Sequence, residues 1–64
     1  MTYFVYIDSR ISSVPHMEPL EAGCPASASL EALERLRMHS DGIAAHVFDG
    51  DTCVASMRRE EQHP

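Results

Sequence analysis

The sequence has few of the residues on which several classes of small protein depend. It contains only two cysteines, too few for the disulfide framework of a small secreted scaffold, so we expect Cys24 and Cys53 to be reduced. Three glycines in all cannot build a glycine-rich phosphate loop. No apolar run is long enough to cross a bilayer, and the first residues lack a basic segment typical of a signal peptide. These absences predict a cytoplasmic protein without a membrane segment.

Positive charge is scarce as well. Five basic residues stand against ten acidic ones, which gives a net charge of −5. An acidic chain repels phosphate backbones, so we expect no nucleic-acid partner. The length of 64 residues and the hydrophobic content of 44% are typical of one small globular domain. We place this domain at residues 1–58 and expect the polar residues 59–64 to form a flexible C-terminal tail.

The stretch from Ser27 to His39 has the pattern of an amphipathic helix. Leucines recur at every third position and predict a buried stripe made of Leu30, Leu33 and Leu36. Ser29 is the expected N-cap, with Ser27 as the alternative, because a hydroxyl there can accept a bond from a free helix N–H. Gly42 is expected to end the helix with a positive φ. A helix this short needs a sheet on which to pack.

Strand-like segments precede and follow this helix. Residues 2–8 are apolar on both faces, which predicts a central strand. Pro15 and Pro19 interrupt the next segment, so any strand within residues 12–22 lies at an edge or is broken. Asp49-Gly50 lies between two alternating runs and predicts a hairpin. The predicted fold is α+β, a two-layer β-β-α-β-β domain with an antiparallel-rich four-stranded sheet and one helix packed on one face.

Alternation within the strands predicts which side chains the helix leaves uncovered. If Val47 pairs with Val54, both valines face the helix together with Val5 and Ile7. The other face then carries the predicted interface residues, which are Phe4, Tyr6, His46, Phe48, Cys53 and Met57. Because no second helix covers this face, we expect a homodimer. The alternative is that residues 15–20 fold across this face and leave a monomer.

Residues with metal-binding or catalytic side chains are present, but not at the spacings of known sites. The potential metal ligands His16, Cys24, His39, His46, Cys53 and His63 form no tight chelating pair. No serine lies in a nucleophile elbow. We therefore predict that the protein is not an enzyme and has no cofactor. One alternative is open, because a turn formed by Asp49-Gly50 alone would place His46 opposite Cys53 as a metal or thiol site.

Two stretches resemble known families. The β-β-α-β-β order, the Ser-Leu-Glu-Ala-Leu helix start and the turn at 47–50 resemble small bacterial proteins of unknown function. Residues 20–24 followed by 29–33 are similar to the loop and helix start of HicB-type antitoxins, over about a quarter of the chain, although a hairpin follows the helix here. That similarity implies a regulator that covers a toxin. Our leading prediction is a non-enzymatic domain that self-associates or binds a protein partner.

Overall fold

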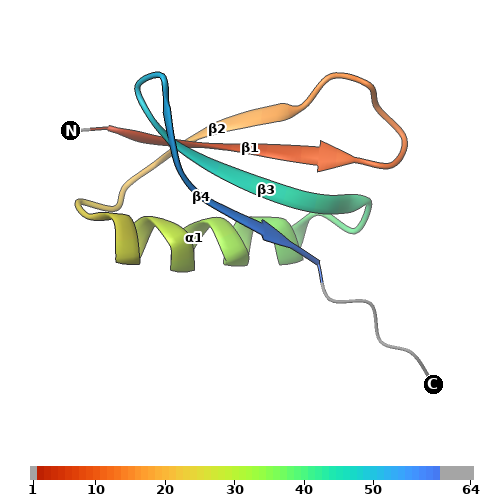
Figure 1. Ribbon diagram of the computed structural model, residues 1–64. Coiled ribbons are helices and arrows are strands. Elements are labelled where there is room, and N and C mark those ends of the chain that lie inside the picture. The colour runs from red at the N-terminus through yellow and green to blue at the C-terminus, as the bar shows by residue number, and fades with distance from the viewer. Residues whose placement is uncertain (1, 60–64) are drawn as a thin grey trace.

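The computed structural model describes residues 2–59, which form one antiparallel sheet of four strands and one helix (Figure 1). The elements are, in chain order, β1 (Tyr3–Ser9), β2 (His16–Leu20), α1 (Pro25–Met38), β3 (Gly42–Asp49) and β4 (Thr52–Arg58). Within the sheet the strands run in the order β2-β1-β3-β4. This confirms the predicted α+β fold and its β-β-α-β-β element order. No helix in the described part of the chain is long and apolar enough to span a membrane.

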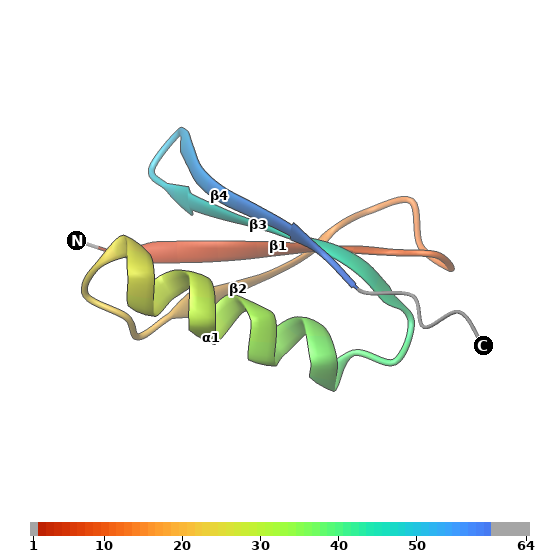
Figure 2. The same cartoon turned by 60° about the horizontal axis from the view of Figure 1, so that its bottom comes forward.

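The helix packs on one face of the sheet (Figure 2). Strand β1 is central, and Tyr3, Val5 and Ile7 on its helix-facing side are buried, as the sequence predicts. Strand β2 lies at the sheet edge, which is the position that Pro19 requires because proline cannot donate to a strand ladder. Since β2 pairs with β1 in the plane of the sheet, the alternative in which residues 15–20 fold across the other face is wrong.

Helix α1 begins at Pro25, two residues before the stretch 27–39 in which the helical pattern was recognised. Pro25 occupies its first turn, where the missing N–H of proline costs nothing, and Cys24 is the N-cap. The prediction of a serine cap is wrong, because no side chain caps this end. Ser29 lies within the helix and not at its start.

The buried stripe of α1 also differs from the prediction. Its buried members are Ala28, Ala32 and Leu36, which are spaced four residues apart. Leu30 is 68% exposed, because at 100° per residue it lies about 200° around the helix from Ala28. Leu33 is half-buried at the margin of the stripe. The small alanines let the helix approach the sheet closely, and the leucine stripe was predicted correctly only at Leu36.

Gly42 does not end the helix as predicted. It is the first residue of β3, and among residues 2–59 only Gly50 has a positive φ, of 62°. Gly42 is instead tightly packed against the end of α1. A Cβ atom at this position would lie 3.0 Å from Leu36 Cδ1 and 3.2 Å from the carbonyl oxygen of His39.

The predicted hairpin between β3 and β4 is confirmed, but its register contains a β-bulge. Gly50 and Asp51 form the loop, and Phe48 pairs with Cys53. The register then shifts, so that Val47 pairs with Ala55 and not with Val54. The extra residue in β4 reverses the direction of every side chain that follows.

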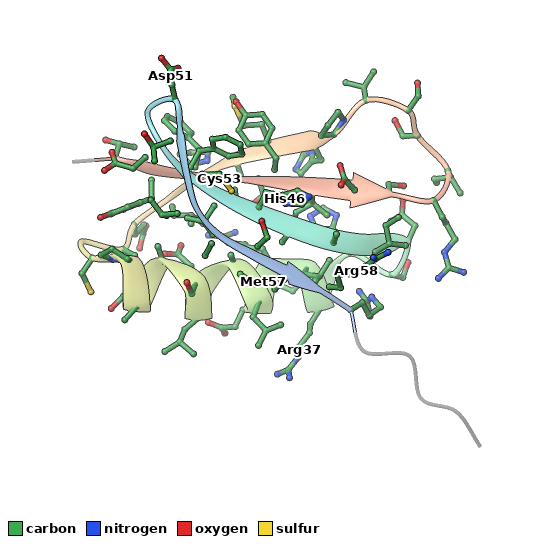
Figure 3. All side chains as sticks on the ribbon, viewed as in Figure 1. Arg37, His46, Asp51, Cys53, Met57 and Arg58 are labelled. Carbon is green, nitrogen blue, oxygen red and sulfur yellow. The ribbon has the colours of Figure 1, made fainter. Side chains whose placement is uncertain are left out.

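The bulge explains two errors in the predicted faces. Val54 does not face the helix and is 36% exposed. Met57, which is labelled on β4 in Figure 3, was predicted on the uncovered face. It packs against the core on the helix side together with Ala55. Met57 is therefore not an interface residue of the uncovered face.

The described chain ends at Arg59, which was predicted to belong to the tail. Its guanidinium group donates hydrogen bonds to the carbonyl oxygens of Leu36, His39 and Gly42. The last carbonyls of a helix have no partner within the helix, so Arg59 caps the end of α1. Arg59 thus belongs to the packed domain, while the rest of the predicted tail lies outside the described residues.

Candidate functional site

The face of the sheet opposite α1 carries an aromatic cluster. Phe4 of β1 pairs with Phe48 of β3, and the ring of Tyr6 packs edge to face on Phe48, with the centroids 5.1 Å apart. On the other side of β1, Met17 pairs with Tyr6 and is 50% exposed. We call this surface the open face, and its apolar members are Phe4, Tyr6, Met17, Pro19, Phe48 and Cys53. Within residues 2–59, no helix or strand covers it (Figures 1 and 2).

His46 lies beside the aromatic cluster and has partners for both ring nitrogens. Its Nε2 atom lies 3.0 Å from Asp8 Oδ2, and its Nδ1 atom lies 2.9 Å from Ser56 Oγ. Because a carboxylate only accepts hydrogen bonds, Nε2–H donates to Asp8, and Nδ1 of the neutral ring accepts from Ser56. The polar groups next to the rings are therefore satisfied within the chain.

The register places most of the predicted interface residues on one face. Phe4, Tyr6, His46 and Phe48 lie there on adjacent strands, and Cys53 lies opposite Phe48. His46 pairs with Ser56, so the alternative register with His46 opposite Cys53 is wrong. The imidazole and the thiol both contact Ser56, and Sγ lies 3.5 Å from the serine oxygen.

A second cluster, which sequence reasoning missed, joins β2 to the end of α1. Glu18 Oε2 lies 2.8 Å from His16 Nε2 and 3.0 Å from His39 Nε2. The two imidazole rings are tilted at 51°, with centroids 4.9 Å apart. The three potential ligand atoms all lie within 4.8 Å of one another. Two imidazole nitrogens and a carboxylate oxygen form a donor set suited to a transition-metal ion.

Helix α1 positions the carboxylate of this cluster through two charged side chains. Arg35 Nη1 lies 3.2 Å from Glu18 Oε1, and Arg35 Nη2 lies 3.4 Å from Glu31. Glu31 in turn accepts hydrogen bonds from the backbone N–H groups of Glu21 and Ala22, at 3.1 to 3.2 Å. The loop between β2 and α1 is thus tied to the same network as the cluster.

The electrostatic surroundings keep Glu18 ionised. Its pKa is lowered first by the hydrogen bond from His39, while burial acts in the opposite direction. The hydrogen bond from His16 and the charge of Arg35 add to the lowering of this pKa. The Glu18 carboxylate is therefore available as an anionic ligand at neutral pH.

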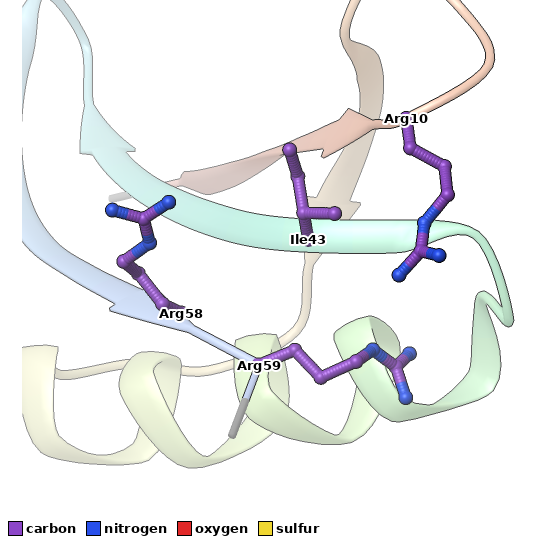
Figure 4. Close-up of a pocket in the computed structure, with 4 residues that line it drawn as sticks. All are labelled: Arg10, Ile43, Arg58 and Arg59. Carbon is purple, nitrogen blue, oxygen red and sulfur yellow. The ribbon is translucent and has the colours of Figure 1, made fainter. Parts of the chain in front are cut away.

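Two cavities lie near the ends of the strands. One, of about 410 Å³, is lined by both His16 and His39 and by the apolar side chains of Ile7, Ile11 and Val14. The other, of about 460 Å³, is lined by Ile43 and by three arginines, Arg10, Arg58 and Arg59 (Figure 4). The second cavity concentrates positive charge at one corner of an acidic chain.

Cys24 and Cys53 are both free and exposed. Cys24 Sγ lies 3.3 Å from Ser27 Oγ at the start of α1. The hydrogen bonds from the Ser27 side chain and backbone hold the pKa of the Cys24 thiol below its usual range. Cys24 thus has more thiolate character than an ordinary exposed cysteine.

Comparisons with known proteins leave the predicted resemblances unsupported. No family model, curated protein or solved structure matches the chain. The stretch 29–33, compared above with the helix start of HicB-type antitoxins, lies inside α1, which begins at Pro25. That similarity stays a prediction, and the candidate sites rest on their own geometry.

Proposed function

We propose that the protein is a self-associating domain that packs the open face of its sheet against the open face of a second copy. The observation that supports this is the aromatic cluster, in which Phe4 and Tyr6 both adjoin Phe48 on adjacent strands. Monomeric proteins rarely expose a contiguous apolar patch of this kind without a partner for it. Aromatic side chains and methionine are also enriched at the centres of protein interfaces.

The size of the sheet indicates a weak dimer. Four strands at about 4.8 Å spacing, of five to eight residues each and about seven on average, give a face of about 450 Å². A stable interface commonly buries about 800 Å² on each partner, so this face falls in the class of small, transient interfaces. We therefore expect the monomer to dominate at micromolar concentration and the dimer to form at hundreds of micromolar.

The charges around the open face favour a second copy over a strongly charged partner. Asp8 and His46 already pair with each other beside the rings. Arg58 pairs with Ala44 on the same face, so a basic group lies at the rim near the acidic one. A face with both signs of charge at its rim and apolar side chains at its centre can meet its own copy without like-charge repulsion.

Dilution of the isotope-labelled chain, followed by amide NMR spectra, tests this proposal. Shifts that depend on concentration are expected in β1, β2 and β3 around Phe4, Tyr6 and Phe48. Amides on the solvent side of α1, near Leu30 and Arg37, serve as the internal control and are expected to stay constant. Concentration-dependent shifts confined to the helix, or spectra that do not change with concentration, would contradict the proposal.

A further inference from the structure

We propose that His16, Glu18 and His39 form a binding site for a divalent transition-metal ion, and that Zn²⁺ fits it best. This site lies on the helix side of the sheet, so it is separate from the proposed dimer face. The proposal rests on the convergence of two imidazole nitrogens, from β2 and from the end of α1, on one carboxylate oxygen. It assigns a metal-binding role to the His16–Glu18–His39 cluster, whose members no short sequence motif connects.

The distances within the cluster suit zinc. Zn²⁺ binds imidazole nitrogen and carboxylate oxygen at about 2.0–2.2 Å, and neighbouring ligand atoms of a tetrahedron of that size lie about 3.3 Å apart. Glu18 Oε2 lies 2.8 Å from His16 Nε2 and 3.0 Å from His39 Nε2. The two imidazole nitrogens lie within 4.8 Å of each other. Rotation of the side chains that widens the O···N distances by a few tenths of an ångström and brings the two nitrogens up to about 1.5 Å closer therefore admits the ion, which replaces the protons that the Nε2 atoms share with the carboxylate.

The backbone holds these side chains in place before any ion binds. His16 and Glu18 alternate in β2, where they pair with Ile7 and Val5 of the central strand. Two residues apart in a strand, they point to the same face. His39 lies just beyond the helix, where its carbonyl oxygen accepts hydrogen bonds from Gly42 N–H and from Arg59. Little backbone movement is needed to bring the three ligands together.

The charges near the cluster leave one carboxylate oxygen free for a cation. Arg35 contacts Oε1 of Glu18, whereas the imidazoles of His16 and His39 both contact Oε2. The positive charge of Arg35 is itself offset by Glu31, which lies 3.4 Å away. With neutral imidazoles, the group of Glu18, Arg35 and Glu31 carries one net negative charge, which favours a divalent ion over an empty site.

Three protein ligands leave the coordination of zinc incomplete. The cavity of about 410 Å³ beside the cluster is lined by both imidazoles, so it adjoins the open side of the site. It has room for the water molecule that usually completes a three-ligand zinc site. The site therefore resembles an open zinc site more than a closed structural one.

Titration of the chelator-treated full-length chain with Zn²⁺ alone, followed by calorimetry, tests the proposal. One ion is expected to bind per chain, and the imidazole NMR signals of His16 and His39 are expected to shift while those of His46 do not. His16→Gln is the most informative variant, because 55% of this side chain is exposed and its loss should leave folding intact. This variant is expected to weaken Zn²⁺ binding by at least about tenfold, as is commonly seen even for partners outside the first ligand shell.

His46→Gln is the matched control, because His46 lies on the open face and not in the cluster. It is expected to bind Zn²⁺ as the parent chain does, and circular dichroism confirms that each variant is folded. The absence of Zn²⁺ binding at millimolar ion, or equal weakening in His16→Gln and His46→Gln, would overturn the assignment. The titration is run at micromolar protein, where the proposed dimer is dissociated. Its result therefore tests zinc binding alone and does not depend on whether the chain self-associates.

Discussion

The ring of Tyr6 packs edge to face on that of Phe48 across β1 and β3, with an interplanar angle of 73° and centroids 5.1 Å apart. Such a pair contributes about 0.5–1.5 kcal/mol beyond the area that it buries. Both rings are nevertheless only half-buried, since α1 packs on the other side of the sheet. The contact thus holds the two rings in a defined arrangement on the open face, while part of their apolar surface stays in contact with solvent.

Substitution of Leu36 by alanine should strongly destabilise the fold, whereas the same change at Leu30 should not. Leu36 is fully buried, so Leu36→Ala is expected to lower the free energy of unfolding by about 2–5 kcal/mol. Leu30 is 68% exposed, and Leu30→Ala should change it by less than about 0.5 kcal/mol. Urea titrations of the two variants measure the difference, and equal effects would mean that the buried stripe of α1 is assigned wrongly.

Substitution of Gly42 by alanine should also destabilise the fold, for a different reason. The added methyl group would lie 3.0 Å from Leu36 Cδ1 and 3.2 Å from the His39 carbonyl oxygen. Overpacking of this kind costs about 1–3 kcal/mol. Gly23 has no atom within 4 Å of the same position, so Gly23→Ala is the control. A Gly42→Ala variant that unfolds at the same temperature as Gly23→Ala would contradict the close packing.

Removal of the Arg59 side chain should weaken the end of α1. The guanidinium group donates to three backbone carbonyls, so Arg59→Ala is expected to cost about 1–3 kcal/mol of unfolding free energy. Arg58→Ala removes the same charge at the exposed neighbouring position and should cost less than about 0.5 kcal/mol. Thermal unfolding of both variants compares them. A larger loss in Arg58→Ala would show that Arg59 does not cap the helix.

Cys24 should be alkylated at lower pH than an ordinary exposed thiol. The lowered pKa increases the thiolate fraction at any pH below its usual range, and the thiolate is the species that reacts. In a Cys53→Ser background, the rate of reaction with iodoacetamide against pH gives this pKa directly. Ser27→Ala should move the midpoint to higher pH, because the hydroxyl next to the sulfur is lost. Ser29→Ala is the control, and an equal displacement in both variants would argue against the Ser27 contact.

Much of the sheet could be predicted from composition and alternation alone. Residues 2–8 are apolar on both faces, and only a central strand buries both. Pro19 excludes an interior position for β2, and Asp49-Gly50 identifies the hairpin. The buried face of the helix was predicted wrongly because the prediction followed the leucines, which are more hydrophobic than alanine. In the structure the small side chains of Ala28 and Ala32 face the sheet, where the helix packs closely.

The remaining errors come from interactions that a local pattern does not contain. The bulge opposite Val47 and Phe48 cannot be recognised from the pattern of polar and apolar residues in β4. Because of this bulge, Met57 lies on the helix side of the sheet. His39 follows Glu18 by 21 residues, so their contact depends on how β2 and the end of α1 are placed in space. The alternation of His16 and Glu18 within one strand was the only local signal for the His16–Glu18–His39 cluster.

Sedimentation equilibrium across a concentration series tests self-association through the open face most directly. The parent chain is expected to have the monomer mass at a few micromolar and a mass approaching twice that at hundreds of micromolar. Phe48→Asp places a charge at the centre of the open face and should keep the chain monomeric, while Leu30→Asp, on the solvent side of α1, should associate as the parent does. A parent mass that stays monomeric throughout, or association that survives Phe48→Asp, would contradict the proposed function.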